Sequence, residues 1–325
     1  VNPGVEYAIL EQAVSGVVAV RVEFNFALLP GQKEIDAIGI SDSDAPIAPT
    51  VNTTTAFESL PNAKTIELQG LVPSSGAVST DGKTLYITAV GETKTEIYSF
   101  TKNASGRWDN KKPEQTLNIN QYYNHLWCIT DNLILKGGAT YTRGTTETGF
   151  ELFTVQNGTY VNQGQLKVSA YNNYDETAEA HLTPDLKVLI MGIETDFSQG
   201  GSDLYFAQQK EDGSYGFLQN MGKVINSAAD EGMCQLLSDT KTLLFSSNGF
   251  SAFGSYDIYV TYRLDDTWKN WSEPINLGSK INSPDFDGLP FYDETNETLY
   301  FISSQNETNS LKAVTLSKAL LMKGK

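Results

Sequence analysis

The chain has 325 residues, of which 40% are hydrophobic and 19% are charged, so it is long enough for one large β domain or two smaller ones with a sizeable core. Its net charge of −16 at pH 7 argues against polyanionic partners, and we expect neither nucleic-acid binding nor binding to anionic membranes. No run approaches the ~20 apolar residues of a membrane-spanning helix, so no membrane insertion is expected.

The first part of the chain differs in pattern from the rest. Residues 18–24 and 34–40 alternate apolar and polar side chains on either side of Leu29, Pro30 and Gly31, which predicts two β-strands. We therefore expect residues 1–45 to form a short β segment. Residues 46–59 follow a stretch rich in Ser, Asp and Pro and are predicted to be a linker.

From about residue 60 onward the sequence repeats itself about every 54 residues. The clearest copies are GSDLYF (201–206) and GSYDIYV (254–260), and each is followed by a second echo, MGKVINS (221–227) and LGSKINS (277–283). A repeat of this length that is rich in short strands predicts one four-stranded propeller blade per copy. We therefore predict an all-β fold, with a β-propeller over residues 60–316 and a C-terminal tail over residues 317–325.

The number of blades follows from counting the strands. The third strand of successive copies carries acidic residues 55, 52 and 54 positions apart, at Glu96, Glu151, Asp203 and Asp257. A weaker fifth copy lacks an outer strand, and a segment with the pattern of an outer strand lies early, at residues 64–68. If this N-terminal strand closes the last blade, five blades form a ring with no exposed edges at the closure. Six blades are the alternative if residues 1–69 form a divergent blade.

The repeats resemble those of a known family. The runs YDIY (256–259), WSEPINLG (271–278), INS (281–283) and DGKTLY (81–86) are similar to TolB-type, WD-repeat-like propeller repeats. The resemblance is strongest to envelope proteins of Bacteroidetes-like bacteria, where such propellers often precede peptidoglycan-binding OmpA-like domains. It covers roughly residues 60–315. The strands predicted in residues 1–45 resemble the closing strands of a galactose-binding-like jelly roll.

This resemblance implies an exported, non-catalytic scaffold that docks a protein or a peptidoglycan or other glycan partner in the cell envelope. The implied location is the periplasm, the outer membrane's surface or the cell surface. The innermost strands of a propeller line its central channel, and the residues that precede them gather at one mouth. Seven candidate ligand-binding residues follow from this position: Tyr123, His125, Glu179, His181, Asp230, Glu231 and Asp287.

Such a funnel of carboxylates and aromatic rings suits a basic peptide, a glycan or a cation. The alternative is that the acidic residues hydrogen-bond neighbouring loop backbone and hold the blades together. A third interpretation is an architectural spacer whose channel is plugged by side chains. His125 and His181 are the only two histidines, and zinc usually takes three or four protein ligands, so no metal site is predicted.

No catalytic residue is nominated by a motif, because the chain lacks a Gly-x-Ser-x-Gly elbow, a phosphate-binding glycine loop and a Cys–His arrangement. Cys128 and Cys234 are expected to be buried free thiols. The alternative function is a carboxylate-dependent glycoside hydrolase, which needs carboxylates that converge in one pocket, one with a strongly raised pKa. No cofactor is expected, and structural calcium at Asp42 and Asp44, or at Asp285 and Asp287, is left open.

Overall fold

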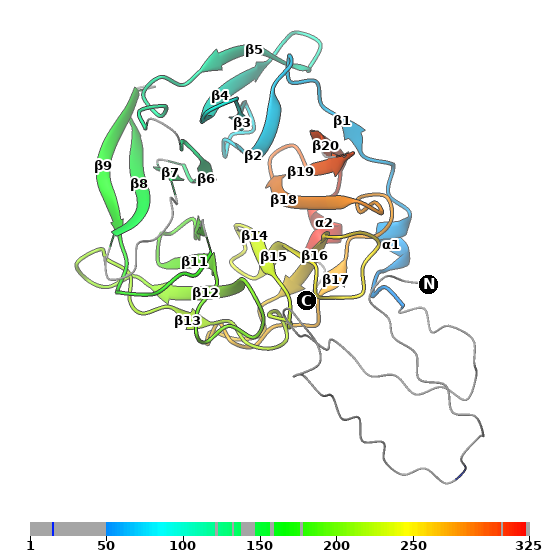
Figure 1. The fold of residues 1–325 in the computed structure, drawn as a ribbon. Helices are drawn as coiled ribbons and strands as arrows, with labels where there is room; N and C mark the ends of the chain where they lie inside the picture. The colour runs from blue at the N-terminus through cyan, green and yellow to red at the C-terminus, as the bar shows by residue number, and fades with distance from the viewer. Residues whose placement is uncertain are drawn as a thin grey trace.

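The computed structural model describes Ser15 and residues 50–322, except 121–122, 132, 138–146, 157–158, 176–177 and 307, and of residues 147–148 it describes the backbone alone. Within this part of the chain, five four-stranded antiparallel sheets are arranged in a ring (Figure 1). The prediction of a five-bladed β-propeller is therefore confirmed. The strands predicted at 18–24 and 34–40 lie outside the described residues, and the domain boundaries predicted from the sequence stay predictions.

Each blade is a meander of neighbouring strands, with the first strand at the ring's centre. Blade I consists of β2 (Val72–Val78), β3 (Thr84–Val90), β4 (Thr95–Lys102) and β5 (Trp108–Pro113). Blade II consists of β6 (Leu126–Ile129), β7 (Leu133–Gly137), β8 (Glu147–Gln156) and β9 (Thr159–Lys167). Blade III consists of β10 (Glu179–Leu182), β11 (Val188–Ile193), β12 (Asp203–Gln208) and β13 (Gln219–Asn220).

The last two blades follow the same order. Blade IV consists of β14 (Glu231–Leu236), β15 (Thr242–Ser247), β16 (Asp257–Tyr262) and β17 (Ile275–Asn276). Blade V consists of β18 (Phe286–Asp293), β19 (Thr298–Gln305), β20 (Thr308–Thr315) and, from the other end of the chain, β1 (Lys64–Thr65).

The hydrophobic core is divided into five clusters, each packed between two adjacent sheets. Between blades III and IV, for example, Ile190 and Phe206 meet Leu243 and Phe245, and all four side chains are buried. Strands β11 and β15 are buried at every residue because sheets cover both of their faces. This explains why the second strand of each copy appears in the sequence as a short continuous apolar run instead of an alternating one.

The ring is closed by the N-terminal strand, as the sequence predicted. Strand β1 pairs antiparallel with β20, with Lys64 opposite Ala313 and Thr65 opposite Lys312. The backbone N–H of Ile66 continues this ladder and donates to the carbonyl of Leu311 over 2.8 Å. The pairing covers the outer edge of blade V, which would otherwise expose a row of unpaired backbone groups.

Residues just before β1 also pack on the ring. The side-chain amide of Asn52 donates to the carbonyl of Pro274 over 2.7 Å, and its own carbonyl accepts from Asn276 N–H over 2.7 Å. The short helix α1 (Thr55–Glu58) buries Phe57 in the cluster between blades IV and V. Residues 52–58, which fall within the predicted linker 46–59, are therefore fixed to blade IV.

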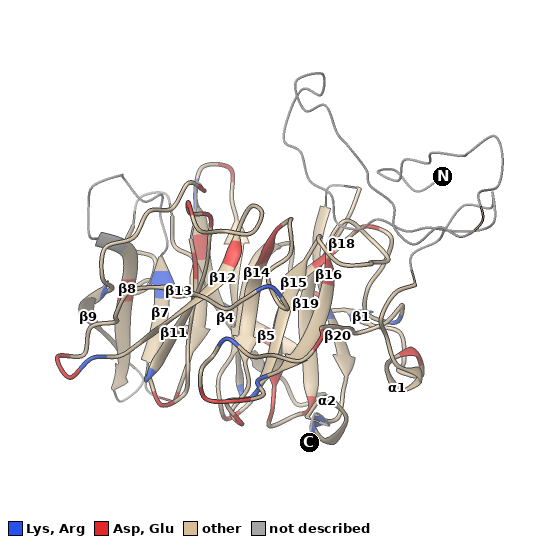
Figure 2. Cartoon of the chain, turned by 90° about the horizontal axis from the view of Figure 1, so that it is seen from below, with Lys and Arg blue, Asp and Glu red and all other residues tan. Residues whose placement is uncertain are grey.

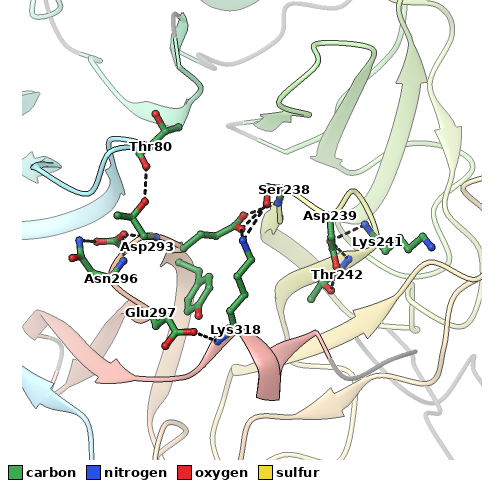
Figure 3. A network of polar contacts seen from close by, with 12 residues as sticks. Thr80, Ser238, Asp239, Lys241, Thr242, Asp293, Asn296, Glu297 and Lys318 are labelled. Carbon is green, nitrogen blue, oxygen red and sulfur yellow. Dashed lines mark hydrogen bonds and ion pairs between the residues drawn. The ribbon is translucent and has the colours of Figure 1, made fainter.

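A polar network links the blades at the face where the inner strands end (Figure 3). Glu294 of blade V accepts from the N–H and hydroxyl of Ser238 in blade IV, each over 2.6 Å, and forms an ion pair with Lys318. Lys318 begins the C-terminal helix α2 (Lys318–Leu321), and its N–H donates to Glu297 over 2.9 Å. The side-chain amide of Asn296 reaches blade I through the carbonyl of Gly82. In the described part of the chain, no helix is long and apolar enough to cross a membrane.

Candidate functional site

Four of the seven predicted residues lie at the start of the inner strands, at the face opposite the network of Figure 3. Each faces a residue of the second strand: His125 lies opposite Gly137, Glu179 opposite Gly192, Glu231 opposite Ser247 and Asp287 opposite Ser303. Glu231 and Asp287 occupy the same register position, because Ser247 and Ser303 lie four residues beyond Leu243 and Leu299. Glu179 lies one pair closer to the hairpin, because Gly192 lies three residues beyond Leu189.

Two of these side chains are engaged by the protein itself. Glu231 accepts from the N–H and hydroxyl of Ser227 and from the hydroxyl of Ser247, each over 2.6 Å. Asp287 accepts from the N–H and hydroxyl of Ser283, again over 2.6 Å. Burial raises the pKa of Glu231 to about 7. In both cases a serine four residues upstream is tied to the carboxylate, so these groups fix the loop that enters the inner strand.

Asp230 also has partners within the protein, although its side chain is partly exposed. It accepts from Ser202 N–H over 3.0 Å, from the amide of Asn248 over 3.1 Å and from the hydroxyl of Tyr256 over 2.9 Å. These contacts join the loops of blades III and IV. Asp175 lies nearby, and burial together with the Asp230 charge raises its pKa.

Glu179 has a different environment from Glu231 and Asp287. The residue four positions upstream is Asp175 instead of a serine, and the residue opposite is Gly192 instead of Ser247 or Ser303. Its Oε2 accepts a hydrogen bond from the backbone N–H of Met233 in blade IV. Burial raises the pKa of Glu179 to about 7, and the charge of Asp175 adds to this rise.

Two glycines make room for the Glu179 carboxylate to reach across to blade IV. A Cβ atom on Gly232 would lie 2.6 Å from Oε2, and one on Gly192 would lie 3.0 Å from it. Both distances are shorter than ordinary contacts, so a side chain at Gly232 would displace the carboxylate. Neither glycine is among the seven residues predicted from the sequence.

The two histidines are both buried, and His181 lies on the inner strand β10 while His125 directly precedes the inner strand β6. His125 is 7% exposed and His181 is 8% exposed, and within the described residues neither Nε2 atom has a hydrogen-bond partner. Burial lowers the pKa of His125 to about 3 and that of His181 to about 4, so both rings are neutral at pH 7. His125 stands between the rings of Tyr123 and Trp127, with centroids 5.4 Å and 4.2 Å away.

The channel holds a cavity of about 60 Å³. Glu179, His181 and Trp127 line it, together with residues of all five inner strands. This space fits a few water molecules, each needing roughly 10–15 Å³, and is far below the roughly 300–1,000 Å³ of typical small-molecule sites. A partner docked at the mouth can therefore insert one small group into the channel, but no sugar ring.

The two cysteines lie at the central cavity, and only one pair of calcium candidates, Asp285 and Asp287, falls within the described residues. Cys128 and Cys234 line the cavity as free thiols, the first buried and the second partly buried. Among the residues that the structure describes, no three His, Cys, Asp or Glu side chains are placed to hold a metal ion. Asp42 and Asp44 lie outside those residues.

Two exposed aromatic residues lie beside the acidic group and were not among the predicted site residues. Tyr174 is 47% exposed and Phe197 is 79% exposed. They lie close together because Tyr174 donates through its hydroxyl to Asp196 over 2.7 Å and through its N–H to the carbonyl of Glu194 over 2.9 Å. Burial and the charges of Asp175 and Asp230 raise the pKa of Glu194, which places it in the same group.

We call the following set the funnel mouth: Tyr123, Tyr174, Asp175, Glu179, Glu194, Phe197 and Asp230. Acidic positions at this end of β12 and β14 are visible in Figure 2. The set combines carboxylates, which accept hydrogen bonds and attract cations, with exposed ring faces, which stack on apolar or cationic surfaces.

Comparison with known proteins defines the fold and no family. No family model matches the chain, and no curated protein matches it. Among solved structures, an endo-arabinase from Bacteroides thetaiotaomicron VPI-5482 has a TM-score of 0.51 at 13% identity, covering 78% of this chain and 96% of that one. A mannose phosphorylase, MPT-4 from Leishmania mexicana, also has a TM-score of 0.51, at 10% identity, covering 81% of this chain and 90% of that one.

A TolB protein is also similar. TolB from Acinetobacter baumannii has a TM-score of 0.43 at 12% identity, and the match covers 74% of this chain. The matched part of this chain spans 53% of the length of that TolB structure. At these identities the similarities reflect the shared propeller fold.

Proposed function

We propose that this protein is a non-catalytic binding module that docks a protein or glycan partner at the funnel mouth. The observation that carries the proposal is the shape of the site. Exposed aromatic rings and carboxylates surround the entrance of a channel of about 60 Å³, which leaves the mouth as the surface where a partner makes most of its contacts. Shallow mouths of this kind suit docking better than they suit enclosure of a substrate.

The chemistry of the mouth supports a partner with cationic or hydroxyl groups. Burial and the charge of Asp230 raise the pKa of Asp175, and burial and the charges of Asp175 and Asp230 raise the pKa of Glu194, so these carboxylates lie close together. Phe197, at 79% exposure, presents a largely exposed ring. A basic peptide would neutralise the carboxylates, a sugar would hydrogen-bond to them, and either would cover the Phe197 ring.

We further propose that the protein works in a bacterial envelope, exported to the periplasm, the outer membrane's surface or the cell surface. The support is the resemblance of its repeats to TolB-type envelope propellers. A peptidoglycan or other envelope glycan is then the natural carbohydrate partner, and an envelope protein the natural protein partner. The strong negative charge fits both, since neither is a polyanion like nucleic acid.

A second candidate function is a glycan-active enzyme, and one observation favours it. Glu179 has a pKa raised to about 7 with Asp175 nearby, and a pair of carboxyl groups with different acidities is what glycoside hydrolysis requires. The narrow cavity beneath Glu179 argues against it.

The experiment that tests the proposal uses two panels of named probes. A phage-displayed heptapeptide library is panned on the immobilised protein, and soluble peptidoglycan fragments and envelope polysaccharides are tested for both binding and release of reducing sugar. Phe197→Ala is expected to weaken the best binders about tenfold, corresponding to ~1.4 kcal/mol. The matched control is Phe217→Ala, which removes a ring of 73% exposure from the connection between β12 and β13.

Binding that depends on Phe197 and not on Phe217 supports the proposal. Equal loss in both variants, or no binder in either panel, contradicts docking at the mouth. Sugar release that disappears in Glu179→Gln would replace the binding module by the enzyme.

A further inference from the structure

We propose that Glu179, His125 and His181 form a receptor site for one primary ammonium group, presented by a lysine side chain of a partner protein. The inference rests on the proposed docking function, because the lysine enters the channel from the funnel mouth. It adds the chemical group that the partner must carry.

Two buried histidine nitrogens in or beside the cavity have no hydrogen-bond partner among the described residues. They are the Nε2 atoms of His125 and His181, and native proteins rarely leave buried polar atoms in that state. His181 and Glu179 line the same cavity, and the ring of His125 lies 4.2 Å from that of Trp127, which also lines it. Two polar side chains of blade III therefore meet in one small space, and His125 of blade II adjoins it through Trp127.

His181 Nε2 and the Glu179 carboxylate are hydrogen-bond acceptors. A hydrogen bond with the backbone of Leu236 raises the pKa of His181, so the ring donates in that bond. Because Nε2 has no partner, the donor is Nδ1, and a neutral imidazole with a proton on Nδ1 has an acceptor at Nε2. Glu179 adds a carboxylate, whose Oε2 already accepts from Met233. The matching ligand group is one that supplies donors.

The size and the donor count of the site favour an ammonium group over other donors. A lysine ammonium is compact and has three N–H donors for the Glu179 carboxylate and for the imidazole nitrogens in and beside the cavity. A guanidinium group is planar, has five donors and is too wide to satisfy them in about 60 Å³. The rings of Tyr123 and Trp127 flank His125 and favour a cation over a neutral hydroxyl.

Long-range electrostatic attraction also favours a cation at this site. The chain carries a net charge of −16, and Asp175, Glu194 and Asp230 stand at the entrance of this channel. A field of this sign draws a cation to the mouth and opposes an anion. The four-carbon stem of lysine can then remain along the aromatic wall while its charged end reaches Glu179.

The test is an NMR titration of protein labelled with ¹⁵N only in histidine. The sequence has two histidines, His181 in the lining of the cavity and His125 beside Trp127, so every histidine signal reports on the proposed site. The probe is Nα-acetyl-lysine N-methylamide, the matched control ligand is the norleucine analogue, which lacks the amine, and cadaverine represents a free amine. Both histidine signals are expected to shift saturably with the lysine probe and to stay unchanged with norleucine.

Protein variants then assign the contact. Glu179→Gln is expected to weaken the lysine probe about tenfold, as removal of a charge-assisted hydrogen bond does. Asp175→Asn is a second variant that keeps Glu179 and weakens binding less. The control is Glu211→Gln, which removes one exposed charge from an outer turn and leaves the affinity unchanged.

Four outcomes overturn the inference. These are no shift with the lysine probe, equal shifts with norleucine, a response to cadaverine alone, and unchanged affinity in Glu179→Gln. If selected peptides bind in a Phe197-dependent manner while the histidine signals stay still, docking at the mouth stands and the ammonium receptor fails.

Discussion

Replacing Glu179 by glutamine is predicted to stabilise the protein above neutral pH while leaving it unchanged in acid. The pKa of Glu179 is raised from 4.5 to about 7 in the folded protein, mainly by burial. Between these two values the folded state holds a proton that the unfolded state has lost, so stability falls as pH rises through this window. A shift of about 2.5 pKa units corresponds to about 3 kcal/mol lost by pH 8.

Glutamine removes this loss because it cannot ionise. Its Oε1 can still accept from Met233 N–H, and its shape fits the space left by Gly192 and Gly232. The other titratable groups around the carboxyl remain in both proteins, so their contributions cancel in the difference. They are Asp175, Tyr123, Cys234 and Tyr256, with His181 beside them in the cavity.

The assay is urea unfolding followed by tryptophan fluorescence at pH 5, 6, 7 and 8. The expected difference in free energy of unfolding is about 1 kcal/mol at pH 5 and grows to about 3 kcal/mol in favour of Glu179→Gln at pH 8. The comparison variant is Glu231→Gln, which leaves three donors from Ser227 and Ser247 with one amide oxygen and should cost about 1–2 kcal/mol at pH 5. Because burial also raises the pKa of Glu231 to about 7, this cost should shrink as the pH rises to 8. A difference for Glu179→Gln that does not change with pH, or that is destabilising at pH 8, would refute the reasoning.

Two further predictions follow from the geometry. Gly232→Ala places a Cβ 2.6 Å from Glu179 Oε2. It is expected to lower the free energy of unfolding in urea by about 1–3 kcal/mol and to weaken binding of the lysine probe. If both quantities stay unchanged, the placement of the Glu179 carboxylate is contradicted. Deletion of the chain through residue 66 removes β1 and exposes the edge of β20. Size-exclusion chromatography should then show self-association of the protein through this edge. A stable monomer would contradict closure of blade V by β1.

The fold could be predicted because its signal is periodic. Acidic positions spaced 52 to 55 residues apart fix the number of complete blades, and a segment at 64–68 supplies the missing outer strand. Strand β1 pairs with β20 at the predicted place. Periodicity determines which strands are equivalent, and this is sufficient to place His125, Glu179, Glu231 and Asp287 at the start of the inner strands, at one end of the channel.

The different surroundings of Glu179, compared with those of Glu231 and Asp287, were not predictable from the repeat alone. Glu179 reaches across to Met233 because Gly232 leaves space in the neighbouring blade, and contacts between blades are not encoded in the spacing of one repeat. One signal was present: Ser227 and Ser283 precede Glu231 and Asp287 by four residues, while Asp175 holds the same place before Glu179.

Exposure of the aromatic residues at the mouth was also hidden in the sequence. Phe197 lies in the loop between β11 and β12, and its composition resembles that of other loops of the chain. Its 79% exposure depends on the loop's conformation, in which Thr195 Oγ1 accepts from the N–H of Phe197 over 3.0 Å. Local hydrogen bonds of this kind orient a side chain without leaving a periodic pattern.

The most direct test of the docking account is a crystal structure of the protein bound to a heptapeptide selected from the library. The account predicts that the peptide lies over the funnel mouth, with its backbone near Phe197 and a lysine ammonium group beside Glu179 and His181. A peptide seated on the outer edge of a blade, or at the opposite face around Lys318, would contradict it.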